Sequence, residues 1–570
     1  MTWRRRLSLA PLALAASAFQ PLGAWTVESA AAYQYDAQAD APAPLLEGVL
    51  IIADVDLFEE SGVAPFSGVR FLGETLAERQ MRRSASGFLS QPLTIENLNR
   101  LSADLTLALD QAGYSVADVA VPEQEVRGGV VQIIVRVGAL GDVRVEGNKH
   151  FSAASLKRLI SLEPGETIRA DRIKRDLITV NTNPFRQADV IFERGDAPGE
   201  TDIVLNVSDR RPFRVFSNYA NNGVSATGLS RFAAGASYGD VWGKGHVADA
   251  QFAISDDGES YWSVGGSYIA PLRSGHVLSF SGDYIRTNIP ANEFFDTRGA
   301  SRRLEAKYSI PLTPLNLRRG DTFLIDMTHE LSGAFQYKRF NNTVEFGGTQ
   351  VFESSPEIFQ FAANYALSLE DELGAWNFNA SGVYSPGGFT EANSDEFFTV
   401  VREDAKAVYA YMNVGLSRVL RLPYNMSLVA RARAQLAGGR LVAPEQFAIG
   451  GASTVRGFQE ATSLGDQGYF ASAELRSPLW TPKLTGLVGA SGDDQLQAAA
   501  FFDIGDVWNH GARTGFENTD NLASAGVGVR YRYAPHFTVK ADLGFQLVDD
   551  PRLEDGSRGQ YGHVSITFSY

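Results

Sequence analysis

The chain has 570 residues, too many for one ordinary domain, and it carries no cysteine and a formal net charge of −15. The missing cysteine excludes disulfide bonds and thiolate chemistry, and the acidic balance argues against a nucleic-acid partner. The mean hydropathy of −0.13 does not exclude a membrane protein. A transmembrane β-barrel alternates lipid-facing and lumen-facing residues, so its average hydropathy stays near neutral.

The first residues predict a secretory signal peptide over 1–24. Three arginines at 4–6 form its basic start, a short apolar run follows to residue 16, and small residues offer cleavage after 18 or after 24. We therefore expect export from the cytoplasm. Residues 25–47 follow as an N-terminal segment or linker with room for one short helix.

Two mixed α/β modules are predicted over 48–138 and 139–210, each in the order β-α-α-β-β. The first begins with an apolar strand at 49–52, continues with an amphipathic helix over 94–113 and has a strand at 130–135. No motif in either module indicates catalysis. The second module shows the full order as a strand at 142–148, helices from Ser152 and over 170–180, and strands near 187–193 and 202–207.

From Phe213 onward the sequence alternates between apolar and polar residues. In one segment, for example, Val527 and Val529 share a face while Arg530 takes the other. Sustained alternation behind an export signal is typical of an outer-membrane β-barrel. At roughly 22 residues per strand and connection, 211–570 predicts an all-β transmembrane barrel of about 16 antiparallel strands. An even number leaves both ends of the barrel in the periplasm.

The most informative motif lies in a long connection expected at 438–467. It holds a single arginine among glycines, inside a region that alternates like a barrel, and this setting indicates a loop folded into the lumen. Two other long outer connections are expected near 286–300 and 385–404. The motif consists of Val455, Arg456, Gly457 and Phe458.

Strand parity gives two further expectations. Phe501 and Asp503 share one face of a strand and Phe502 takes the other, and since a charge on the lipid face is unfavourable, Asp503 should face the lumen. The last strand places Phe568 and the terminal Tyr570 on its lipid face. A terminal aromatic residue on such a strand resembles the signal that outer-membrane insertion machinery recognises.

The sequence contains one motif of the kind found in enzymes. Residues 235–239 fit the pattern G-x-S-x-G, but they lie in an alternating strand and lack the strand–turn–helix setting of a nucleophile elbow. The seven histidines show no metal-ligand spacing. We therefore predict that the chain is not an enzyme and that it has neither a cofactor nor a metal site.

With these residues placed, the chain resembles the outer-membrane transporters of two-partner secretion, the ShlB/FhaC/HecB family, over roughly 48–570. This family belongs to the superfamily that includes the barrel-assembly factors. In the modules the resemblance rests on Gly113-Tyr114, Val121-Pro122-Glu123-Gln124, Gly128-Gly129-Val130-Val131-Gln132, Val145-Glu146-Gly147-Asn148, Pro164-Gly165, Asn183-Pro184-Phe185-Arg186 and Thr201-Asp202. In the barrel it rests on the V-R-G-F motif, Gly465-Asp466-Gln467-Gly468, Glu474-Leu475 and Phe502-Asp503-Ile504-Gly505.

The resemblance implies a location and a mechanism. The modules would be periplasmic POTRA domains, the first of the ShlB type, below a barrel in the outer membrane of a Gram-negative bacterium. They would catch an unfolded, TpsA-like exoprotein, by adding its strand to an exposed sheet edge, and the barrel would pass it to the surface. Arg456 would pair with Asp503. Outer-membrane lipid and lipopolysaccharide would surround a monomer that the barrel-assembly machinery inserts.

Two other functions stay open at this point. A barrel-insertion factor shares the barrel and the V-R-G-F loop but often carries more POTRA modules, and a passive porin would not need periplasmic modules. The chain also departs from the family in one respect. The segment 25–44 shows no convincing amphipathic stripe, so the sequence leaves open whether a pore-plugging helix exists there.

Overall fold

The computed structural model describes residues 43–570 except for eight short stretches. The predicted signal peptide and nearly all of the segment 25–47 lie outside the described residues. The chain divides into two compact units, Met1–Arg210 and Arg211–Tyr570. The stretches not described are 115, 198, 291–294, 320–321, 347–348, 484–493, 512–517 and 553–556.

The first module is built on a four-stranded sheet in the order β2-β1-β4-β3. The side chain of Thr94 caps helix α2 by accepting a hydrogen bond from the Asn97 backbone N–H, and Leu101 and Leu105 on the helix are fully buried. The elements are β1 (Gly48–Ile52), β2 (Gly68–Leu72), α1 (Glu78–Ser86), α2 (Ile95–Gln111), β3 (Ala117–Ala120) and β4 (Val130–Val137). The short 3-10 turn η1 (Val55–Leu57) lies between β1 and β2.

This module has one strand more than the predicted β-α-α-β-β order. Strand β2 pairs in parallel with β1 at the edge of the sheet. It is five residues long and carries Arg70 at its centre, so neither its length nor its composition stood out in the sequence. The predicted order includes two helices, but the sequence did not locate the first of them, α1, because its only fully buried side chains are Met81 and Ala85.

The second module has the order β-α-α-β-β, with a three-stranded sheet in the order β5-β7-β6. Helix α3 ends at Lys157, and Leu159 and Ile160 beyond it pack in the core. The elements are β5 (Ala139–Glu146), α3 (Ala153–Lys157), α4 (Ala170–Asn181), β6 (Arg186–Arg194) and β7 (Glu200–Asp209). No helix among the described residues is long and apolar enough to cross a bilayer.

The two modules are coupled closely. Only Gly138 separates β4 from β5, and its backbone N–H donates to the carbonyl of Val116 at 2.8 Å. A side chain at position 138 would collide with Val116. The guanidinium of Arg169 in the second module stacks on the ring of Tyr114 in the first, 5.1 Å from its centroid. Val116 itself belongs to the hydrophobic core of the second module.

The second unit is a closed antiparallel barrel of 16 strands, counted over the described residues. Two short strands, β14 (Leu315–Arg319) and β16 (Thr349–Ser354), lengthen the hairpins on either side of β15. The sixteen are β8 (Phe213–Ala220), β9 (Arg231–Val241), β10 (His246–Ser255), β11 (Tyr261–Pro271), β12 (Val277–Pro290), β13 (Phe295–Pro311), β15 (Thr322–Phe346), β17 (Glu357–Asp371), β18 (Gly374–Pro386), β19 (Val408–Arg421), β20 (Ser427–Ala437), β23 (Gln467–Arg476), β24 (Asp494–Trp508), β25 (Thr519–Tyr533), β26 (Phe537–Gln546) and β27 (Gln560–Ser569).

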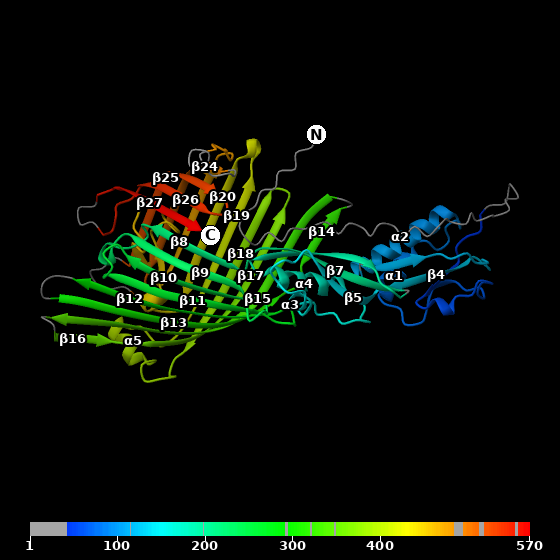
Figure 1. Ribbon diagram of the computed structural model, residues 1–570, viewed down its shortest axis with the longest axis horizontal. Coiled ribbons are helices and arrows are strands. Elements are labelled where there is room, and N and C mark those ends of the chain that lie inside the picture. Colours follow the sequence, from blue (N-terminus) through cyan, green and yellow to red (C-terminus); the bar gives the residue numbers. More distant parts are fainter. Residues whose placement is uncertain are drawn as a thin grey trace. The chain divides into compact units, whose positions relative to one another are not determined.

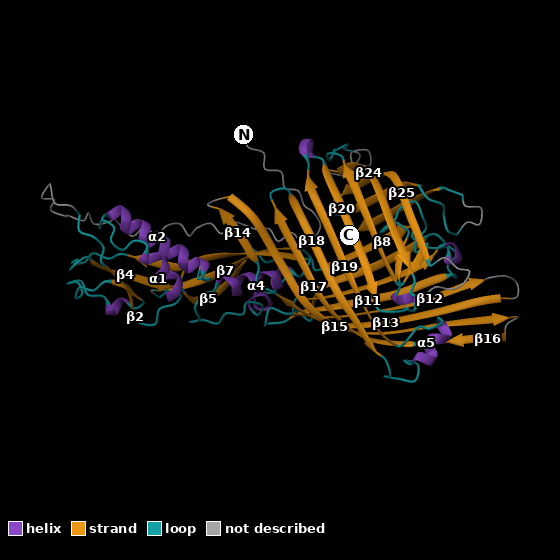
Figure 2. Ribbon diagram, turned by 180° about the vertical axis from the view of Figure 1, so that it is seen from behind, coloured by secondary structure: helices purple, strands orange, loops and turns teal. Residues whose placement is uncertain are grey.

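The barrel closes where its first and last strands meet. Strand β27 pairs with β8, and the terminal Tyr570 exchanges two backbone hydrogen bonds with Val215, at 2.9 and 3.0 Å. Figures 1 and 2 show the strands following one another around the wall. Closure leaves no unpaired sheet edge, which is the requirement for backbone inside a bilayer.

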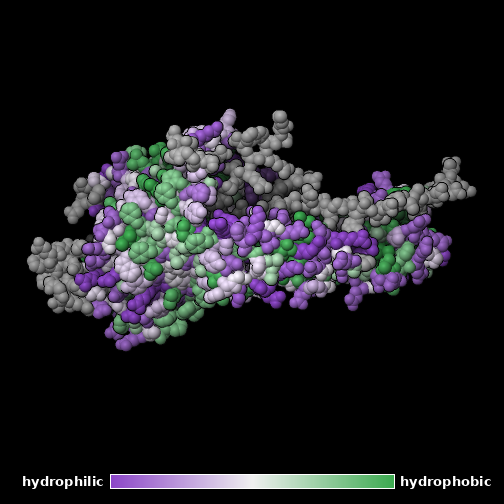
Figure 3. All heavy atoms as spheres, in the orientation of Figure 1, coloured by the Kyte–Doolittle hydropathy of each residue, from purple (hydrophilic) through white to green (hydrophobic). Residues whose placement is uncertain are grey.

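The two faces of the wall differ as the alternation predicts. Val527 is 55% exposed and Phe502 is 48% exposed on the outer face, whereas Asp503 beside it is fully buried on the inner face. Figure 3 shows hydrophobic side chains gathered over the barrel strands. The long connection expected at 286–300 is wrong, because β12 extends to Pro290 and β13 begins at Phe295.

The other two long connections exist, at the end of the barrel opposite to the start of β8. The connection between β18 and β19 contains helix α5 (Asp395–Val401), and that between β20 and β23 contains η4 (Ala443–Glu445) and a hairpin of β21 (Phe447–Ile449) and β22 (Ser463–Gly465). Two short 3-10 turns lie elsewhere, η2 (Ser225–Thr227) and η3 (Pro423–Asn425).

Candidate functional site

The connection 438–466, hereafter the inner loop, folds into the lumen. The inner loop carries the V-R-G-F motif between β21 and β22. Val455 and Phe458 are fully buried and pack with Phe447 and Ile449 of the loop hairpin. The same cluster includes lumen-facing side chains of the wall, which are Phe470, Val507 and Leu522.

Arg456 is fully buried inside the lumen and binds Asp503 of β24. Its Nε donates to Asp503 Oδ2 at 2.7 Å and its Nη2 donates to Asp503 Oδ1 at 2.9 Å. The backbone N–H of Arg456 also donates to Oδ2, at 3.1 Å. A planar guanidinium forked on a carboxylate fixes direction as well as distance, so this contact sets the orientation of the loop tip.

Two more carboxylates complete the surroundings of Arg456. Glu474 of β23 accepts a short hydrogen bond from Arg456 Nη1, and an oxygen of Asp542 on β26 lies 3.6 Å from the same nitrogen. Arg530 of β25 bridges both carboxylates, at 3.0 and 2.6 Å. The guanidinium of Arg456 also lies over Phe501, 3.5 Å from its ring centroid. Charges of both signs are therefore interleaved where four neighbouring strands face the loop.

The sequence pointed to Asp503 but not to Asp542 or to Arg530. Glu474 stood in a family motif without an assigned role. Which inward residues of four strands lie level with one another depends on the register, and no local pattern reveals that register. The alternation does place all of these residues on the inner face.

Gly457 brings the loop backbone onto the barrel wall. Its φ is +90°, which favours glycine, and an added side-chain carbon would lie 3.1 Å from backbone atoms of Gly544 on β26. The Gln546 side chain donates to the Gly457 carbonyl at 2.8 Å, and the Gly457 N–H points to His563 Nε2 at 3.3 Å. Both residues of this contact, Gly457 and Gly544, are glycines, and a side chain on either one would hinder the close approach of the two backbones.

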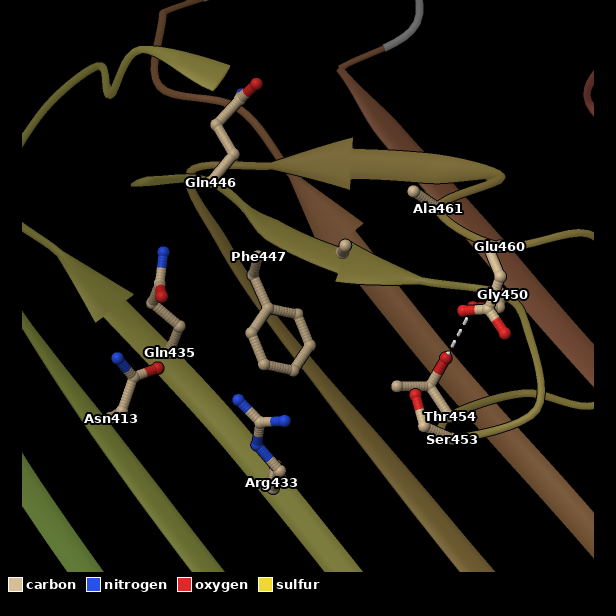
Figure 4. Close-up of a pocket in the computed structure, with 11 residues that line it drawn as sticks. Asn413, Arg433, Gln435, Gln446, Phe447, Gly450, Ser453, Thr454, Glu460 and Ala461 are labelled. Carbon is tan, nitrogen blue, oxygen red and sulfur yellow. Dashed lines mark hydrogen bonds between the residues drawn. The ribbon is translucent and has the colours of Figure 1, made fainter. Parts of the chain in front are cut away.

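A cavity of about 300 Å³ separates the inner loop from the wall at β19 and β20. Phe447 reaches toward it from the loop, and Asn413, Arg433 and Gln435 face it from the wall (Figure 4). The loop turn beside it is closed by a hydrogen bond of 2.8 Å from Thr454 to the Gly450 carbonyl. The cavity is polar and has room for about ten water molecules.

The family-motif residues of the first module serve the fold of that module. The Gln124 side chain pairs with both backbone groups of Gln132, at 2.7 and 2.8 Å, and also donates to the Pro122 carbonyl at 3.1 Å. This arrangement ties the loop before β4 to the strand.

In the second module the motif residues shape turns. Gly147 has a φ of +77°, and a side chain there would meet the Val207 carbonyl. Asn148 donates to the Phe151 carbonyl at 2.8 Å. The Asn183 side chain accepts a hydrogen bond from the Phe185 N–H at 3.0 Å, and Phe185 is buried in the core. The Pro184 carbonyl accepts a hydrogen bond from Arg210.

At the end of the chain, Phe568 and Tyr570 point outward and are 56% and 82% exposed. Phe568 packs against Phe537 of β26 in a tilted arrangement, with 4.7 Å between ring centroids. Among the described residues, no group of three or more His, Asp or Glu side chains is arranged to hold a metal ion.

Two small α+β modules ahead of a closed outer-membrane barrel, with an arginine-anchored loop in its lumen, define a protein transporter of the POTRA–barrel class. The family model for haemolysin secretion/activation proteins ShlB/FhaC/HecB matches residues 199–531. The model for ShlB-type POTRA domains matches 64–138, and that for POTRA domains described as surface antigen variable number repeats matches 139–210. The chain belongs to the ShlB/FhaC/HecB family.

Known relatives are similar over most of the chain. The outer membrane transporter CdiB of Dickeya dadantii (strain 3937) is 22% identical over 466 residues, which cover 78% of this chain and 76% of the relative. The heme/hemopexin transporter protein HuxB of Haemophilus influenzae is 20% identical over 493 residues, covering 83% and 81%.

Solved structures show the same fold. CdiB from Escherichia coli superimposes with a TM-score of 0.74 at 18% identity, covering 94% of this chain and 92% of the other. CdiB from Acinetobacter baumannii gives a TM-score of 0.65 at 16% identity, covering 93% and 91%.

Several predictions from the sequence are thereby confirmed. The chain is an outer-membrane transporter of two-partner secretion, its barrel lies in the outer membrane, its POTRA domains lie in the periplasm, and its family implies a secreted exoprotein partner. The predicted fold class is confirmed as well. The comparisons favour neither an insertion factor nor a porin.

Proposed function

We propose that this transporter secretes one unfolded exoprotein and that the ion pair of Arg456 with Asp503 holds the inner loop where transport requires it. The observation that carries the proposal is the burial of Arg456, which is 0% exposed in a lumen lined by polar groups. A charged side chain taken out of water needs a specific partner, and Asp503 supplies it with two parallel hydrogen bonds. The pair therefore defines a single position for the loop tip.

The modules supply the first contact with the partner. An extended chain that arrives from the inner membrane meets them first, and sheet edges offer it ready-made backbone hydrogen bonds. Four strands lie at sheet edges in the two modules. These are β2 and β3 in the first module and β5 and β6 in the second.

Three of these four edge strands have at least one backbone group that is already bonded within the chain. Arg82 donates to the Val69 carbonyl on β2 at 2.5 Å. The start of β5 pairs with residues 165–168, and the Asn181 side chain pairs with both backbone groups of Ala188 on β6. Among the described residues no such contact covers β3. We therefore assign β3 as the strand onto which the exoprotein adds.

This assignment can be tested by cross-linking, since the chain has no cysteine of its own. Asp118→Cys places a thiol on the exposed face of β3, and Arg70→Cys places one at the matching exposed position of β2. A secretion-blocked exoprotein that carries single cysteines should form a disulfide with position 118 and not with position 70. Equal yields at both positions would refute the assignment.

Two genetic experiments test the function as a whole. Deletion of 139–209 should abolish secretion while a heat-modifiable barrel remains in the outer membrane, because the exoprotein would lose its receptor but not its conduit. Loss of the gene should remove one surface protein and leave other outer-membrane barrels at normal levels. A general fall in barrel proteins would instead indicate an insertion factor.

The surroundings of the barrel follow from its outer face. The closed wall leaves no edge for a second copy, which supports a monomer within outer-membrane lipid and lipopolysaccharide. The outward Phe568 and Tyr570 support recognition by the barrel-assembly machinery during insertion. The relatives are transporters, and we propose no enzymatic step for this chain.

A further inference from the structure

A second connection also folds inward, at the outer end of the barrel. Residues 387–407, hereafter the mouth segment, join β18 to β19 and contain α5. Phe398 of α5 is fully buried against Ile358 and Tyr409, which lie on the inner face at the outer ends of β17 and β19. The same apolar cluster includes Leu441 from the base of the inner loop. The mouth segment thus covers part of the lumen wall.

The first half of the mouth segment is tied to the start of β17. The Glu357 N–H donates to the Ala392 carbonyl at 3.0 Å, and Asn393 donates to the Glu357 carbonyl at 2.8 Å. Thr390 donates to the Glu357 carboxylate at 2.8 Å. These bonds hold the segment beside the wall and away from the outside.

The second half of the mouth segment is bound to Asp466, a residue of the G-D-Q-G motif whose role the sequence left open. Asp466 is fully buried and binds Arg402 of the mouth segment through two nitrogens, one at 3.1 Å and one in a shorter contact. It also accepts the backbone N–H groups of Leu441 at 2.8 Å and His510 at 2.9 Å. One carboxylate therefore joins three separate outer connections.

Arg440 forms a second link between the same two segments, this time with the arginine on the inner loop and partners on the mouth segment. It projects from the inner loop and donates to the Glu403 carbonyl at 2.9 Å and to the His510 carbonyl at 2.8 Å. It also lies 3.3 Å from the carboxylate of Asp404. The mouth segment is thus bound to the inner loop by an arginine from each side.

We infer that the mouth segment is a second constriction of the conduit and that Asp466 and Arg402 are positioning residues that latch it closed. Apart from the Phe398 cluster and a tilted ring contact of Phe389 with Phe359, 5.1 Å between centroids, its contacts with the rest of the barrel are mainly hydrogen bonds and ion pairs. Buried ion pairs are weak stabilisers, because the charges must leave water, but they specify one arrangement and release their groups into water when broken. Such contacts suit an element that must open and close again.

The inference rests on the proposed function, since a transported chain has to pass the mouth. The inner loop is anchored at mid-barrel by Arg456, between three carboxylates. The mouth segment is held by hydrogen bonds to Glu357, by the arginine links to the inner loop and by one apolar cluster, and the Arg402 side chain is 22% exposed whereas that of Arg456 is 0% exposed. Of the two inward elements, the mouth segment is therefore the one that the exoprotein displaces.

The first experiment measures ion conductance of the purified chain in planar bilayers without any exoprotein, so it does not depend on secretion. Arg402→Met and Asp466→Asn should each raise the conductance or the open fraction several-fold. The matched control is Arg418→Met, which breaks a similar forked pair with Asp371, at 2.8 and 2.9 Å, at the entrance end. Unchanged conductance in the two latch variants, or an equal rise in the control, would overturn the inference.

The second experiment locks the mouth segment. Ala392→Cys with Glu357→Cys places two thiols on residues linked by a backbone hydrogen bond of 3.0 Å. A disulfide joins residues whose Cα atoms are about 4.4–6.8 Å apart. The oxidised pair should block secretion, and a reductant added outside should restore it to the level of the same double variant kept reduced. Ala392→Cys alone should secrete normally, because Ala392 contacts β17 through its backbone carbonyl. Normal secretion by the disulfide-locked chain would refute the inference that the mouth segment opens during transport, and it would leave the proposed transport function unaffected.

Discussion

Carboxylates are used in two different ways in the barrel and in the second POTRA module. In the barrel, Asp503 is bound by the guanidinium of Arg456, which comes from a loop distant in sequence. In the module, Asp209 at the end of β7 accepts the backbone N–H groups of three consecutive residues, 149–151, at 2.9–3.0 Å. A cation joins segments that could otherwise separate, whereas backbone donors fix a turn that the chain already forms.

The module carboxylates also differ from each other. Partial burial by itself would raise the pKa of the Asp209 carboxyl, but the three backbone N–H donors outweigh it and hold that pKa below its usual range. Asp176 on α4 is only 2% exposed, and its burial raises its pKa to about 6, although Ser161 donates to it and Arg172 and Arg175 lie nearby. The number and charge of the donors decide which carboxylate favours its ionised form.

The largest effect is expected from the cation of the barrel pair. Arg456→Ala leaves Asp503 buried without its guanidinium, and removing one partner of such a pair costs about 3–5 kcal/mol. The loop tip should then be displaced and secretion abolished, while the barrel still inserts. Arg456→Lys should restore little, because an ammonium cannot fork onto both oxygens. Secretion assays with heat-modifiability as the insertion control measure both, and normal secretion by Arg456→Ala would contradict the role of the pair.

A smaller effect is expected from Glu474→Gln. Glu474 binds Arg456, Arg530 and Arg476, but Arg456 keeps its two bonds to Asp503 when the second carboxylate becomes an amide. Secretion should fall partially, and the inner loop should become more sensitive to protease added from outside. If Glu474→Gln abolished secretion as fully as Arg456→Ala, the anchor would depend on the whole charge cluster and not on the forked pair.

The sequence reveals the parts of this site that depend on local parity. Alternation assigns Asp503 to the inner face and Phe502 to the outer face without knowledge of the partner strands. The contacts of Arg456 with Glu474 and Asp542 depend on how β23, β24 and β26 are staggered, and stagger is a property of the closed barrel.

The mouth segment marks another limit of the sequence. Its position was expected as an outer connection, but nothing in 385–404 distinguishes a loop that folds inward from one that extends into water. Phe398 is one aromatic residue among many, and its burial depends on Ile358 and Tyr409 from distant strands. The extra strand β2 was missed for a different reason, since five residues around an arginine carry too little alternation to be recognised.

In the module, Asp209→Ala should lower stability without touching the barrel. The change leaves the N–H groups of residues 149–151 without their acceptor, and a lost acceptor costs about 1–3 kcal/mol. The fragment 43–210, which has its own two hydrophobic cores, should melt roughly 4–8 °C lower for a loss of about 2 kcal/mol. The control Asp196→Ala, in the exposed turn after β6, should melt like the parent fragment. An equal melting temperature for Asp209→Ala would show that water replaces the carboxylate.

The smallest effect concerns the pH dependence of Asp176. Because the folded module raises the pKa of Asp176 from 3.8 to about 6, the folded state binds more protons than the unfolded state between these values. Stability must therefore fall as the pH rises from about 4 to about 6, the opposite of the trend that Asp209 produces with its lowered pKa. The penalty for ionised Asp176 above pH 6 is on the order of 2–3 kcal/mol.

Asp176→Asn removes the titratable carboxyl group but keeps an oxygen that can accept a hydrogen bond from the Ser161 N–H, which Asp176 binds at 2.8 Å. The variant should lose most of the decline in stability between pH 4.5 and pH 7, and it should be the more stable of the two proteins at pH 7. Urea unfolding of the fragment 43–210 at both pH values measures the difference. An unchanged slope in Asp176→Asn would mean that Ser161, Arg172 and Arg175 stabilise the carboxylate as well as water does, and that burial alone does not set its protonation.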